Sequence, residues 1–140
     1  MTLIILKFFH YLAIIFSGGV LVGGGLIQAI FARSNQIPDK TVGKVLKILG
    51  YLGLISIIIL WITGIFLSNI IYGGFSINTA FTIKIIAAAF LLLISFIVNI
   101  HVYNSSKNNY PPNKSIMKFS TMSTRGLIII VLFGAAIAFS

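Results

Sequence analysis

Four long apolar stretches, separated by short polar connections, constrain what this chain can fold into. The stretches run Ile5–Ala32, Lys44–Tyr72, Thr79–Tyr103 and Lys114–Ser140, and a helix of about 20 residues crosses the hydrocarbon core of a bilayer. Because lipid offers no partner to open backbone groups, each stretch is predicted to be a helix. The sequence therefore predicts an all-α fold, a single domain over residues 1–140 that forms a four-helix up-and-down bundle in the membrane.

The composition supports a membrane location. Of the 140 residues, 59% are hydrophobic and 8% are charged, and the mean hydropathy is +1.12, whereas about a quarter of the residues of a soluble domain are charged. The first apolar run, Leu3–Phe31, is longer than the apolar core of about 7–15 residues in a cleavable signal peptide, so we expect it to remain as a helix. The absence of cysteine excludes disulfides and thiol catalysis.

The charges predict an orientation. Ten basic residues stand against one acid, Asp39, for a net charge of +9, and most of the basic residues lie in or beside the first and third connections. By the positive-inside rule these connections face the cytoplasm. We expect a multi-pass protein of the cytoplasmic (inner) membrane with both termini on the outer side. Anionic lipid headgroups account for the excess charge, and no nucleic-acid partner is predicted.

Three ionisable side chains within the apolar stretches are candidates for function. His10 and Lys84 lie roughly 10 Å and 7 Å below the outer starts of their helices, at the 1.5 Å rise per residue of an α-helix, and therefore at similar depth. His101 lies roughly 25 Å along the helix axis from Lys84. His10 and His101 consequently cannot ligate one metal or one heme, and we predict that His101 lies at the cytoplasmic interface.

His10 is a candidate axial ligand for heme iron, because imidazoles in helical bundles serve that role. Ser17 and Gly18 are small enough to leave space for a flat ring on the same helix. Lys84 would act as a second ligand or as a cation facing a heme propionate; alternatively, its side chain extends to the outer interface. Ordinary helix packing also explains the small residues, and the Gly19–Gly23 pair leaves room for a homodimer.

Several segments resemble the HemJ/CopD-like superfamily of small four-helix bacterial membrane proteins, which includes HemJ-type protoporphyrinogen oxidases and the CopD copper-resistance domain. The similar segments are LKFFHYLAIIFSGG and FAR in the first stretch, LWITGIFL in the second and TIKIIAAAFLLL in the third. The resemblance implies heme b, with His10 and Lys84 as the functional pair. The chain departs from the family pattern at Phe16 and Ser17, where a tryptophan is usual before the glycines.

These observations lead to a hypothesis and two alternatives. The leading hypothesis is a heme b-binding membrane protein with a redox or electron-transfer role, and this role includes a relation to protoporphyrinogen oxidation. Any enzyme activity would be that of a membrane-bound oxidoreductase. One alternative is a non-catalytic accessory subunit of a larger membrane complex. The other is CopD-like copper handling, although the methionines lie away from His10. The site residues predicted for the heme are His10 (heme iron), Lys84, Ser17 and Gly18.

Overall fold

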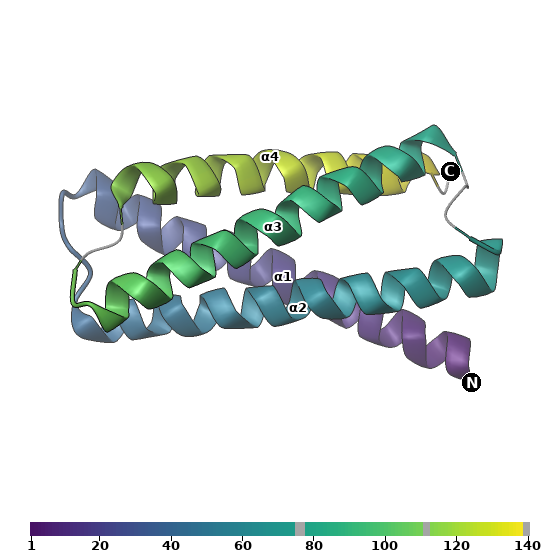
Figure 1. Cartoon of the computed structure of the whole chain (residues 1–140), viewed down its shortest axis with the longest axis horizontal. Coiled ribbons are helices and arrows are strands. Elements are labelled where there is room, and N and C mark those ends of the chain that lie inside the picture. Colours follow the sequence, from purple (N-terminus) through teal and green to yellow (C-terminus); the bar gives the residue numbers. More distant parts are fainter. Residues whose placement is uncertain (75–77, 111–112, 139–140) are drawn as a thin grey trace.

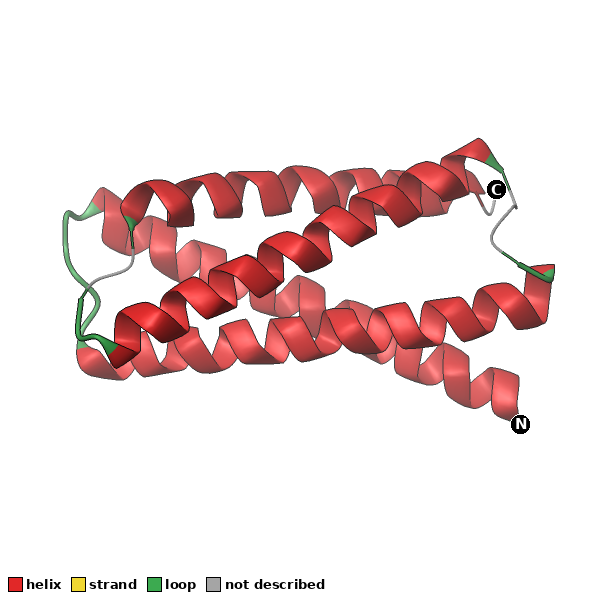
Figure 2. Ribbon diagram, in the orientation of Figure 1, coloured by secondary structure: helices red, strands yellow, loops and turns green. Residues whose placement is uncertain are grey.

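The computed structural model describes residues 1–74, 78–110 and 113–138, and every regular element within these ranges is a helix (Figures 1 and 2). The helices are α1 (Thr2–Arg33), α2 (Lys40–Tyr72), α3 (Thr79–Lys107) and α4 (Lys114–Ala138). Each is long and apolar enough to span a membrane. The prediction of an all-helical chain with four candidate membrane spans is therefore confirmed.

Several helix ends differ from the predicted ones, and a polar cap accounts for the start of α2. The side chain of Asp39 accepts a hydrogen bond from the Val42 backbone N–H at 2.8 Å, so α2 begins at Lys40 rather than at Lys44. The first helix begins three residues before its predicted start, and α3 continues four residues past its predicted end, to Lys107. α4 begins at Lys114 as predicted, while its predicted end at Ser140 lies outside the described residues.

Many of the large apolar side chains face outward, and most of the buried side chains are small or polar. Ile15, Phe66 and Phe133 are among the many large apolar side chains that are more than half exposed. The buried polar side chains include Ser17, Ser56, Thr63, Ser68 and Ser120. Most of these hydroxyls donate to a backbone carbonyl, as Ser56 does to Leu52 at 2.8 Å. This distribution suits a protein whose solvent is lipid, where small residues allow helices to approach closely.

The helices form two hairpins. α1 packs along α2 and α3 packs along α4, and a smaller contact between α2 and α3 joins the pairs. Figure 1 shows α1 and α3 crossing obliquely to the other two helices. Glycines mark the close approaches: a methyl group at Gly53 of α2 would lie 3.2 Å from Val20 of α1, and one at Gly134 of α4 would lie 3.2 Å from the Ala80 carbonyl of α3.

The chain order gives the bundle two different ends. The α1–α2 and α3–α4 connections lie at one end, called the basic end here because Arg33, Lys40, Lys107 and Lys114 flank them. The start of α1 and the described end of α4 lie at the other, called the terminal end (Figure 1).

Candidate functional site

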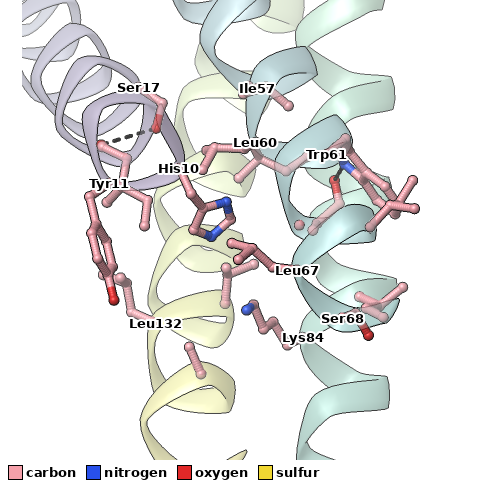
Figure 3. Close-up of a pocket in the computed structure, with 18 of the residues that line it drawn as sticks. His10, Tyr11, Ser17, Ile57, Leu60, Trp61, Leu67, Ser68, Lys84 and Leu132 are labelled. Atoms are coloured by element: carbon pink, nitrogen blue, oxygen red, sulfur yellow. Dashed lines mark hydrogen bonds between the residues drawn. The ribbon is translucent and has the colours of Figure 1, made fainter. Parts of the chain in front are cut away.

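A pocket of about 520 Å³ lies between the hairpins in the half of the bundle near the terminal end (Figure 3). All four helices contribute to its walls, which are mainly apolar. Its polar and small lining residues are Lys7, His10, Tyr11, Ser17 and Gly18 of α1, Trp61, Gly64, Ser68 and Tyr72 of α2, Lys84 and Ala88 of α3, and Ala135 of α4. The four residues predicted to hold a cofactor, two of which are the ionisable His10 and Lys84, therefore line one pocket.

His10 reaches the pocket from α1 and is fixed by α2. Its Nδ1 lies 2.8 Å from Oγ1 of Thr63, and that hydroxyl lies 2.7 Å from the Ile59 carbonyl oxygen. A threonine hydroxyl has one proton, so when it donates to the Ile59 carbonyl it accepts a hydrogen bond from His10 Nδ1–H. This arrangement leaves Nε2 as the unprotonated nitrogen, and within the described part of the chain Nε2 has no hydrogen-bond partner.

The imidazole also lies beside a glycine of α2. A methyl group at Gly64 would lie 3.6 Å from His10 Cε1, an ordinary van der Waals distance. Gly64 directly follows Thr63, so one turn of α2 supplies both the hydrogen-bond partner and a neighbour of the ring. Figure 3 shows the ring inside the pocket, among side chains of α2 and α4.

Lys84 enters the same pocket from α3. In Figure 3 its amine and the His10 ring point toward one another across the pocket. Lys84 Nζ also lies 5.5 Å from the centre of the Phe81 ring, a cation–π distance. Gly134 of α4 packs directly on the base of the lysine, because a methyl group there would lie 3.1 Å from Lys84 Cβ. The contact between α3 and α4 therefore fixes the position of the Lys84 backbone and Cβ.

Ser17 and Gly18 line the pocket in different ways. The Ser17 hydroxyl donates to the Ile14 carbonyl at 3.2 Å, a bond within its own helix. A side chain at Gly18 would meet nothing within 4 Å, so this position leaves open space. Ala88 lines the pocket as well, and its carbonyl accepts a hydrogen bond from Trp61 Nε1 at 3.4 Å.

His101 lies at the basic end, far from the pocket. Its Nε2 accepts a hydrogen bond at 3.0 Å from the backbone N–H of Asn113, directly before α4 begins. The ring therefore ties the last turns of α3 to the start of α4. Because His10 and His101 serve opposite ends, they do not share a ligand.

Thr63 is the site residue that the sequence reasoning missed. A signal was available: in an antiparallel hairpin, residues equally far from the connection face each other, and His10 lies as many residues before Arg33 as Thr63 lies after Lys40. Lys84 lies equally far before Lys107, the end of α3. Counting from the helix ends thus places all three residues at one level.

The described residues contain no group of three or more His, Cys, Asp or Glu side chains that could hold a bare metal ion. No protein-family model, curated protein or solved structure matches this chain.

Proposed function

We propose that this chain is a membrane protein that binds heme b in the pocket between its hairpins and takes part in electron transfer. The observation that carries the proposal is the His10–Thr63 hydrogen bond. It leaves the lone pair of His10 Nε2 available inside an apolar pocket, and heme iron requires such a nitrogen as its axial ligand. The Thr63 partner plays the part that outer hydrogen bonds play for metal-bound histidines, because it sets tautomer and ring orientation.

The remaining wall residues fit the group. The pocket volume of about 520 Å³ falls within the range of about 300–1,000 Å³ typical of ligand and cofactor sites. Gly18, Gly64 and Ala88 keep the walls shallow where a planar ring needs room. Lys7 and Lys84 line the same pocket, and the ammonium group of a lysine can lie beside an anionic group such as a propionate.

Each residue of the site has a distinct role in this proposal. Heme, when bound, supplies one-electron redox chemistry. His10 would donate the lone pair of Nε2 to the iron, and Thr63 increases the basicity of that nitrogen by accepting a hydrogen bond from Nδ1–H. Lys84 offsets negative charge, and the apolar walls exclude water. Any enzyme activity that accompanies the heme would be that of a membrane-bound oxidoreductase.

The test is an absorption spectrum of the purified chain in detergent, before and after reduction with dithionite and again after hemin is added. A Soret band with sharp α and β bands in the reduced sample is expected. A spectrum that stays blank after addition of hemin would contradict the proposal and favour an accessory subunit. Copper retained in place of heme would favour metal handling.

Replacement of Thr63 tests the hydrogen bond itself. Thr63→Val keeps the shape of the side chain but removes the acceptor for His10 Nδ1–H, so we expect heme affinity to fall about 10–100-fold, as for other outer partners of metal ligands. Thr63→Ser keeps the hydroxyl and should stay within a few-fold of the native chain. Hemin titration followed at the Soret band measures both, and equal affinities for Thr63→Val and the native chain would refute the role assigned to Thr63.

We also propose that the basic end faces the cytoplasm and that both termini lie outside. The support is the distribution of charge, since Lys and Arg near membrane helices favour the cytoplasmic side. The chain has no cysteine, so a single cysteine introduced at Ser34 or at Thr2 reports one end each. In intact cells a membrane-impermeant maleimide should label Thr2→Cys and leave Ser34→Cys unlabelled, and the reverse pattern would invert the assignment.

A further inference from the structure

We propose a second binding site, for the phosphate of an anionic phospholipid, at the basic end of the bundle where α4 lies beside α1. Its residues are Lys114, Lys118 and Arg125 of α4 and Gln28 of α1, and none of them lines the heme pocket. The site is independent of heme binding.

The three cations lie on one face of α4. Lys114, Lys118, Thr121 and Arg125 are separated by four, three and four residues, the spacing that brings side chains onto one face of a helix. All three cationic side chains are exposed. The face therefore presents a row of positive charge that leads from the start of α4 toward the middle of the bundle.

Two contacts show that this face meets α1. Thr121 Oγ1 lies 3.3 Å from Gln28 Oε1, and a methyl group at Gly25 would lie 3.1 Å from Arg125 Nη2. The absence of a side chain at Gly25 lets the guanidinium lie directly against α1. Gln28 and Gly25 of α1 therefore lie against the cationic face of α4.

The site has donors and positive charge but no anion of its own. Within the described residues, Lys114, Lys118 and Arg125 make no ion pair or side-chain hydrogen bond. The single acid of the chain, Asp39, caps the start of α2. A guanidinium has five N–H donors that match the oxygens of a phosphate, so an external phosphate would complete the site.

Depth favours a lipid over the other sources of an anion. Arg125 lies about 16 Å along α4 from Lys114, where the helix begins. The residues that follow it, from Gly126 to Ala138, are all apolar, so Arg125 lies at the boundary between the basic part and the apolar part of α4. Its side chain leans toward the start of α4, as side chains on helices do, and so toward the headgroup layer. A lipid phosphate lies at that level, whereas a carboxylate on a partner helix would have to be buried there.

Native mass spectrometry of the full chain tests the site. The protein is released from micelles that contain equal amounts of phosphatidylglycerol and phosphatidylcholine, and the ratio of the two lipids that remain bound is measured. Each cation near a membrane surface contributes about 1 kcal/mol to anionic lipid binding, which corresponds to about fivefold. We expect Arg125→Gln and Lys118→Gln each to lower the phosphatidylglycerol preference about fivefold.

The matched control is Lys44→Gln, which removes one exposed charge at the basic end but from α2, a helix that does not pack along α4. Because Lys44 lies outside the proposed site, Lys44→Gln should lower the preference clearly less than Arg125→Gln does. Equal preferences in Arg125→Gln and the native chain would overturn the proposal, as would an equal loss in Lys44→Gln. Displacement of the lipid by inorganic phosphate at constant ionic strength would assign the site to free phosphate. An Arg125-dependent protein partner in place of lipid would assign it to a partner helix.

Discussion

Replacement of His10 by alanine is expected to abolish heme binding, whereas His101→Ala should leave it unchanged. His10 Nε2 lies in the pocket with its tautomer fixed by Thr63. The His101 ring is occupied at the basic end by its hydrogen bond to the Asn113 N–H. Loss of an outer hydrogen-bond partner lowers the affinity of a metal site about 10–100-fold. Loss of the axial ligand itself should lower it further, so we expect the heme affinity of His10→Ala to fall more than about 100-fold. Hemin titration of both variants measures the difference.

Rescue separates loss of the ligand from loss of the fold. His10→Gly leaves a space beside Gly64 and keeps the rest of the pocket, and imidazole added in solution can enter that space and supply the missing nitrogen. We expect imidazole to restore the Soret band in His10→Gly and to change little in the native chain. If His10→Gly has the same Tm as the native chain but imidazole does not restore the Soret band, a ligand role for His10 is contradicted. A loss of heme in His101→Ala would contradict the separate roles of the two histidines.

The sequence was sufficient for the architecture because lipid leaves few choices for an apolar stretch. The helix ends were harder to predict, since Lys40–Gly43 is polar enough to read as a connection although the Asp39 cap starts α2 there. Depth counting also placed His10 and Lys84 at one level, and the structure puts both on the walls of one pocket.

The sequence could not predict the contacts that fix these side chains. In the sequence Thr63 is one of several polar residues of an apolar helix, and the rotation of α2 against α1 decides whether its hydroxyl meets His10. Arg125 interrupts the last apolar stretch in the sequence, and only the packing of α4 beside Gly25 relates it to α1. The sequence alone does not distinguish Gly126 from Gly134, although in the structure Gly126 faces open space and Gly134 is packed against α3.

That difference between two glycines of α4 leads to the largest expected effect on stability. In Gly134→Leu the new Cβ would lie 3.1 Å from Lys84 Cβ and 3.2 Å from the Ala80 carbonyl oxygen. Because these atoms belong to the backbone and to the base of a side chain, they cannot rotate away, and α3 and α4 must separate. Overpacking of this kind typically costs about 1–3 kcal/mol, so we expect Tm to fall by roughly 3–10 °C for a chain of this size.

Gly126→Leu is the matched control, since a Cβ at Gly126 meets no atom within 4 Å. Both variants replace glycine by leucine in the same helix, so both gain the higher helix propensity of leucine. The difference between their Tm values therefore reports the cost of crowding the α3–α4 contact. Trp61, the one tryptophan of the chain, provides the fluorescence signal for thermal unfolding in detergent. Gly134→Leu should also weaken hemin binding, because it displaces the backbone that carries Lys84 into the pocket, whereas Gly126→Leu should leave hemin binding intact. Equal Tm values for the two variants would mean that α3 and α4 do not approach as closely as the structure places them.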